Sequence, residues 1–150
     1  MTTRIRVSRF IQADPTSTAL LLAGPTAIEM WPGVRRLGRV AGRFLVEAAL
    51  PPEVADDRAA ASVHARRPQR TAASLVTRFS WTGPGLPVTE GRVTLSGSPA
   101  GRGRVATEAV LVLEAGALAM SRLDAGDLTR MAEAFLANLG AAAEQRRVAA

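Results

Sequence analysis

The chain has 150 residues, the size of one ordinary folded domain, and we treat residues 1–150 as a single unit. Hydrophobic residues make up 47% and charged residues 21%, which excludes an intrinsically disordered chain. The absence of cysteine excludes disulfides and thiolate chemistry, and the absence of lysine excludes Schiff-base chemistry, while a net charge of +6 keeps nucleic-acid binding open.

The first predicted element is a strand, because Ile5, Val7 and Ile11 alternate with residues of the opposite face. A short helix is expected next, with Asp14 as its N-cap and a proline at its first position. Gly24 and the proline after it should end this helix. We expect Thr26 to cap a second short helix over residues 27–30.

The N-terminal segment also bears on localisation. Charged and aliphatic residues alternate over residues 4–9, whereas a signal peptide needs an uninterrupted apolar run. The richest apolar stretch, residues 19–23, is far shorter than the about 18 residues of a membrane span. We therefore expect a cytoplasmic protein without a membrane span.

The middle of the chain reads as a series of strands broken by glycine and proline. The predicted strands cover residues 34–40, 43–49, 61–67, 72–81, 88–96 and 104–114. Short connections between consecutive strands favour an antiparallel meander over a parallel sheet. The glycines at 101 and 103 join two of these strands, so we interpret this segment as a hairpin loop and not as a phosphate-binding loop.

The C-terminal segment predicts a long amphipathic helix over residues 124–147. Leu128, Met131, Phe135 and Leu139 recur at spacings of three and four, which places them on one face. Either Asp124 or a second aspartate three residues later can cap its start. The chain is therefore predicted to belong to the α+β class.

This order of elements resembles the helix-grip fold of the START-related superfamily, which includes polyketide cyclases and lipid-transfer domains. The resemblance rests on the strand that ends in Ile11-Gln12-Ala13-Asp14-Pro15, on the segment Met30-Trp31-Pro32-Gly33-Val34, on the late strands at 91–95 and 104–109, and on residues 135–139 of the helix. It implies a curved antiparallel sheet around the long C-terminal helix, with two short helices after the first strand.

The resemblance also implies a cavity for a hydrophobic, lipid-like or polyketide-like molecule between the sheet and the helix, because a curved sheet does not lie flush on one helix. We expect no cofactor and no metal ion. The candidate ligand-binding residues are Trp31, His64, Arg78, Trp81, Met131 and Phe135. The aromatic and apolar members of this set are first of all interpreted as core, and their contact with a ligand depends on how much of the cavity stays open.

His64 is the only histidine, so it is the natural proton shuttle if the protein is a cyclase. Glu47, Glu90, Arg92 and Glu108 also lie on predicted strands, but the sequence does not decide which polar residues face a cavity. If Val46 faces inward, alternation places Glu47 outside. By the same alternation, Arg78 faces away from Phe79 and Trp81.

Two alternatives stay open beside the hydrophobic-ligand interpretation. The first is an arginine-rich nucleic-acid-binding module, which the scattering of the arginines among 13 acidic residues disfavours. The second is a regulatory domain with a collapsed cavity. Enzyme status, ligand identity and oligomeric state are left open by the sequence.

Overall fold

The computed structural model describes residues 3–49, 58–65, 68–82, 89–101, 103–116 and 124–149. Its helices are α1 (Pro15–Ala23), the 3₁₀ helix η1 (Pro25–Met30) and α2 (Ala125–Ala149). Its strands are β1 (Thr3–Ile11), β2 (Val34–Val40), β3 (Arg43–Ala49), β4 (Arg58–Ala65), β5 (Gln69–Arg70), β6 (Ser74–Thr82), β7 (Thr89–Pro99) and β8 (Val105–Ala115). The expected two short helices after the first strand and the long C-terminal helix are confirmed.

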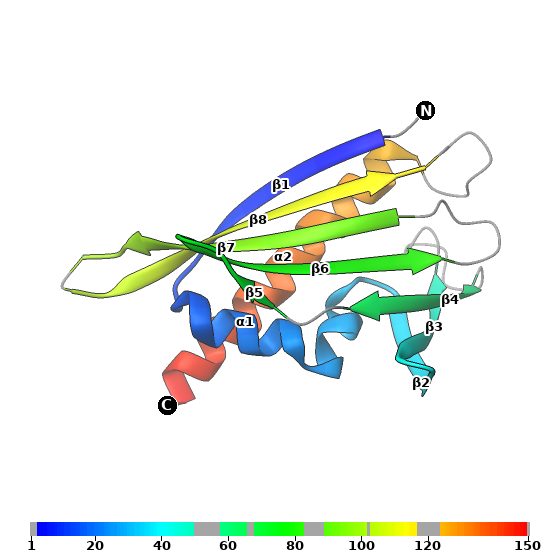
Figure 1. The fold of residues 1–150 in the computed structure, drawn as a ribbon, viewed down its shortest axis with the longest axis horizontal. Helices are drawn as coiled ribbons and strands as arrows, with labels where there is room; N and C mark the ends of the chain where they lie inside the picture. The colour runs from blue at the N-terminus through cyan, green and yellow to red at the C-terminus, as the bar shows by residue number, and fades with distance from the viewer. Residues whose placement is uncertain are drawn as a thin grey trace.

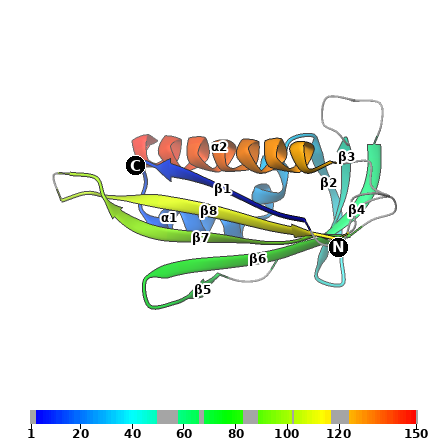
Figure 2. The same cartoon turned by 90° about the horizontal axis from the view of Figure 1, so that it is seen from above.

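The strands form one eight-stranded antiparallel sheet in the order β1-β8-β7-β6-β4-β3-β2, with β5 paired to β6. Consecutive strands from β2 to β8 are neighbours, apart from the short β5, and β1 pairs with β8 over its whole length. Helix α2 packs against β1 and β8 and runs obliquely behind the sheet (Figure 1). The strands β2, β3 and β4 turn away from the plane of the other strands, toward the start of α2 (Figure 2). This is the curved sheet around a helix that the resemblance to the helix-grip fold implies.

The core lies between α2 and the concave face of the sheet. The predicted stripe of α2 is buried, with Leu128 and Leu139 fully inaccessible to solvent. Facing it, Ile5 pairs with Leu113 and Val7 pairs with Leu111, so alternate residues of β1 and β8 share the buried face. Strand alternation thus decides which side chains of each strand face the helix.

Helix α1 begins as predicted. Asp14 accepts hydrogen bonds from the Ser17 backbone N–H at 3.0 Å and from the Ser17 hydroxyl at 2.7 Å, and a proline occupies the first turn. The prediction that Thr26 caps the second helix is wrong. That helix starts at Pro25, two residues before the predicted start, with Gly24 as N-cap and no side-chain cap, because the proline's fixed φ already suits a first helical position.

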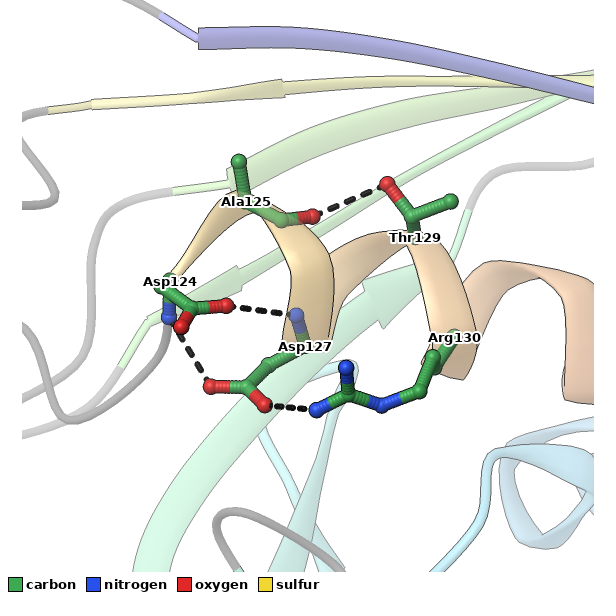
Figure 3. A network of polar contacts seen from close by, with 5 residues as sticks. All are labelled: Asp124, Ala125, Asp127, Thr129 and Arg130. Atoms are coloured by element: carbon green, nitrogen blue, oxygen red, sulfur yellow. Dashed lines mark hydrogen bonds and ion pairs between the residues drawn. The ribbon is translucent and has the colours of Figure 1, made fainter.

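The start of α2 uses both aspartates that were alternatives in the sequence (Figure 3). The Asp127 N–H donates to the Asp124 carboxylate at 2.7 Å, and the Asp124 N–H donates to the Asp127 carboxylate at 3.0 Å. Arg130 donates to the same Asp127 carboxylate one turn along. This reciprocal arrangement satisfies two backbone donors at the helix end, in the manner of a capping box.

Two predicted turns are hairpins. Ala41 and Gly42, both with positive φ, form the two-residue turn between β2 and β3. Gly101 and Gly103, also with positive φ, lie in the connection of β7 to β8. The short strand β5 was not predicted and lies where a break was expected. Among the helices that the structure describes, none is long and apolar enough to cross a membrane.

Candidate functional site

A cleft of about 570 Å³ opens between the concave face of the sheet and the helical segments. Its described lining is mainly apolar, and its volume lies in the range of small-molecule sites. The lining residues come from α1, η1, the strands β2, β3, β4, β6 and β7, and α2: Leu22, Ala23, Gly24, Ala27, Ile28, Trp31, Arg36, Gly38, Arg39, Phe44, Val63, Ala65, Pro68, Thr77, Phe79, Val93 and Phe135.

Aromatic side chains from three elements meet beside this cleft. Trp31, which follows η1, stacks on Phe135 of α2 with ring centroids 4.3 Å apart. Its edge meets the rings of Trp81 and Phe79 on β6, at centroid distances of 4.7 and 5.7 Å. Edge-to-face and offset pairs of this kind are the favoured aromatic geometries, so the cluster forms a well-packed wall.

Two local features hold the aromatic cluster in place. The Asn138 side chain on α2 donates a hydrogen bond to the Met30 carbonyl at 2.7 Å, which fixes η1 and therefore Trp31 against the helix. Gly91 on β7 pairs with Phe79, and a Cβ at Gly91 would overlap the Phe79 ring. The glycine thus allows the ring to lie across the neighbouring strand.

The polar groups of the described cleft lining are few and were not singled out by sequence reasoning. Arg36 and Arg39 come from β2, and Thr77 comes from β6. Thr77 is only 4% exposed, and its hydroxyl oxygen has no hydrogen-bond partner among the described residues. The cleft therefore combines apolar walls with two guanidinium groups and one buried hydroxyl.

The sequence candidates His64 and Arg78 lie on the opposite, convex face of the sheet. They line a second depression of about 390 Å³ together with Glu90, Arg92 and other residues. Arg78 pairs directly with Arg92 across β6 and β7, and His64 pairs with Ser80 across β4 and β6. Because successive strand residues point to opposite faces, these side chains point away from Phe79, Trp81 and the cleft, as alternation predicts for Arg78.

The six candidates therefore separate into two groups. Trp31 and Phe135 line the cleft, and Trp81 packs on Trp31. Met131 is 2% exposed and belongs to the core cluster. A ligand-binding role for any of these residues stays a prediction. The strand carboxylate Glu47 faces the convex side, where it pairs with Arg35 at 3.0 Å, while Val46 is buried as expected.

The Asp14 carboxylate, at the start of α1, lies outside the cleft. The hydrogen bonds from the Ser17 hydroxyl and backbone N–H lower the pKa of Asp14, the cap of α1. In the part of the chain that the structure describes, no three histidine or carboxylate side chains come together as a metal site would require.

Comparison with known proteins identifies the fold. No protein-family model matches the chain, and no curated protein does. Among solved structures, a START superfamily protein from Mycobacterium smegmatis superimposes with a TM-score of 0.63 at 13% identity, covering 95% of this chain and 97% of that one. The Zhui aromatase/cyclase from Streptomyces sp. R1128 gives 0.58 at 17% identity, covering 97% and 96%.

A conserved protein from Geobacillus kaustophilus gives a TM-score of 0.65 at 8% identity, covering 95% of this chain and 96% of that one. At such low identities the likeness shows the fold alone. The chain has the START-like helix-grip fold, so the resemblance based on its sequence is confirmed at the level of architecture.

Proposed function

We propose that this protein binds a hydrophobic small molecule of lipid-like or polyketide-like character in the cleft between its sheet and its helices. The observation that carries the proposal is the cleft itself, about 570 Å³ with a mainly apolar lining. The rings of Trp31 and Phe135 give it a rigid aromatic wall on which a flat or extended apolar ligand can pack. The likeness to a START superfamily protein and to an aromatase/cyclase supports the same interpretation.

The convex face offers less support for the alternative of nucleic-acid binding. Its arginines alternate with carboxylates: Arg78 pairs with Arg92, and the next row of the sheet pairs Glu90 with Glu114. A groove that follows a phosphate backbone needs a continuous positive surface. The alternating rows on this face do not provide one.

A fluorescence titration with N-phenyl-1-naphthylamine, a neutral apolar probe, tests the proposal. Ala65 lines the cleft while being exposed, so Ala65→Trp fills part of the cleft without disturbing the core. The neighbouring His64→Trp places the same ring on the opposite face of β4 and serves as the matched control.

We expect the wild-type protein and His64→Trp to bind the probe alike and Ala65→Trp to bind it about tenfold more weakly. Tenfold corresponds to losing roughly 55 Å² of buried probe surface at about 25 cal/mol per Å². Equal affinities for the wild-type protein and Ala65→Trp would show that the probe does not occupy the cleft. Absence of binding to the wild-type protein would contradict the proposed function.

A further inference from the structure

Strand β2 brings two arginines to the concave face of the sheet, at the edge of the cleft. Arg36 pairs with Val46 and Arg39 pairs with Phe44, and both partners belong to the inward-facing row of β3. Regular alternation would put residues 36 and 38 on one face and residue 39 on the other. The two arginines share a face because the register shifts between them.

The shift is a β-bulge at Leu37. The ladder steps from Arg36 opposite Val46 to Gly38 opposite Leu45, so Leu37 is the extra residue, and it is 55% exposed. Bulges commonly occur beside functional sites because they redirect a side chain at little cost to the sheet. Here the bulge redirects Arg39 into the cleft lining, and no pattern in the sequence predicts this bulge.

The Arg39 guanidinium is positioned and available for a ligand. It lies 5.3 Å from the centroid of the Phe44 ring, which also lines the cleft, and no described carboxylate forms an ion pair with it. Arg36 makes a long ion-pair contact with Glu29, at 3.8 Å. Among the described lining residues, Arg36 and Arg39 are the charged groups, and there is no aspartate or glutamate.

Thr77 provides a second, independent indication of a ligand. Its hydroxyl is buried on the cleft side of β6 without a partner among the described residues. A buried hydroxyl without a hydrogen bond is unfavourable, and such groups are normally paired. A polar atom of a bound molecule would pair it. In the sheet order, β4 and β3 separate Thr77 from the two arginines.

From these observations we infer that the ligand is an amphipathic acid, whose anionic group binds Arg39 and Arg36 and whose apolar body carries a polar atom that pairs with Thr77. The inference rests on the proposed function, because it specifies the chemistry of the same cleft. An arginine pair is suited to a carboxylate, sulfonate or phosphate group, since the guanidinium presents several donors in a fixed plane. A ligand that contacts both the arginine pair and Thr77 must extend across β4 and β3.

Two probes with the same ring skeleton test the inference. 8-Anilino-1-naphthalenesulfonate carries an anionic group, and N-phenyl-1-naphthylamine lacks it. The amine of the neutral probe is free to donate to the Thr77 oxygen, whereas the amine of the anionic probe is adjacent to its sulfonate, so the anionic probe reports on the arginine end alone. The variants are Arg39→Gln, Arg36→Gln and Thr77→Val. Arg78→Gln is the matched control, because it removes one positive charge from the convex face and lowers the net charge equally.

Arg39→Gln is expected to lower the affinity for the anionic probe about 5- to 20-fold and to change the affinity for the neutral probe by less than about twofold. This is the size expected of a charge-assisted contact that is partly open to solvent. Arg36→Gln should also lower the affinity for the anionic probe, and Arg78→Gln should change the affinity for neither probe. Thr77→Val should lower the affinity for the neutral probe, whose amine is free to pair with the Thr77 oxygen, and should leave the affinity for the anionic probe within about twofold, because a sulfonate held at β2 keeps the adjacent amine away from β6.

The outcomes separate this inference from the proposed function. If the neutral probe binds in the cleft and Arg39→Gln and Arg78→Gln affect the anionic probe equally, the acidic-ligand inference is overturned while the proposed function stands. If Thr77→Val leaves the affinity for the neutral probe unchanged, the assignment of Thr77 is overturned. If neither probe binds the wild-type protein, both the inference and the proposed function fail.

Discussion

Two buried threonines on the concave face of the sheet lead to opposite expectations for the same substitution. Thr77 is 4% exposed and its hydroxyl has no partner among the described residues, whereas Thr107 is fully buried and donates to the Ala13 carbonyl at 2.6 Å. Thr→Val keeps the shape of the side chain and replaces the hydroxyl by a methyl group. The difference between the two sites therefore isolates the effect of the hydrogen bond.

The magnitudes follow from the cost of burying a hydroxyl without a partner, about 1–3 kcal/mol. In ligand-free protein, Thr77→Val should raise the free energy of unfolding by about 1–2 kcal/mol, since it removes that penalty and adds an apolar group. This gain corresponds to a Tm increase of about 2–8 °C for a chain of this size. Thr107→Val should lower the free energy of unfolding by about 1–3 kcal/mol, because it leaves the Ala13 carbonyl unpaired.

Urea denaturation followed by the fluorescence of Trp31 and Trp81 measures both effects. The protein should first be unfolded and refolded to remove bound molecules, and the m-values should be equal, so that the shift in midpoint reports stability. If Thr77→Val were as destabilising as Thr107→Val, the Thr77 hydroxyl would have a partner in solution. The reasoning about an orphaned group in the cleft would then be refuted.

Three further predictions concern the fold. Gly91→Ala should lower the free energy of unfolding by about 1–3 kcal/mol, because the new Cβ would overlap the Phe79 ring. Adding Phe79→Leu should recover part of this loss, as measured by urea denaturation. If the effects of the two substitutions simply add, the contact is contradicted. Ala41→Asn should raise the free energy of unfolding by about 0.5–1 kcal/mol, because Ala41 has a φ of 52° in a turn that favours asparagine. An unchanged thermal midpoint would contradict this prediction. Asp14→Ala should lower the free energy of unfolding by about 1 kcal/mol at neutral pH. Because the folded-state pKa of Asp14 is lowered, its stabilisation is present above the unfolded-state pKa and is lost as the pH falls through the folded-state value. The free energies of unfolding of the wild-type protein and Asp14→Ala should therefore converge in acid. A pH-independent difference between them would contradict the cap.

Much of the fold could be predicted from local patterns. The spacing of Leu128, Met131 and Phe135 predicts a buried helix face, because a 3.6-residue apolar period over this length is typical of an amphipathic helix. The turn at Ala41 and Gly42 and the cap at Asp14 also depend on neighbouring residues only. Thr26 was misassigned because a preceding proline can begin a helix without a side-chain cap.

The cleft was harder to predict because it depends on pairing between distant strands. Alternation correctly predicted that the side chains of Arg78 and Phe79 lie on opposite faces of the sheet, but the sequence did not show which of these faces meets the helix. Arg39 faces the cleft only because of the bulge at Leu37, which is a property of the β2 and β3 register. Thr77 becomes notable only when its hydroxyl is seen to be buried without a partner.

The most direct test of the central claim is methyl NMR of the protein titrated with N-phenyl-1-naphthylamine. Val63 and Val93 line the cleft, whereas Val76 and Val110 lie on the convex face of β6 and β8. Binding in the cleft predicts saturable shifts and probe-to-methyl NOEs at Val63 and Val93, with Val76 and Val110 unchanged. Shifts confined to Val76 and Val110, or no saturable shifts, would contradict the proposal that the cleft binds a hydrophobic ligand.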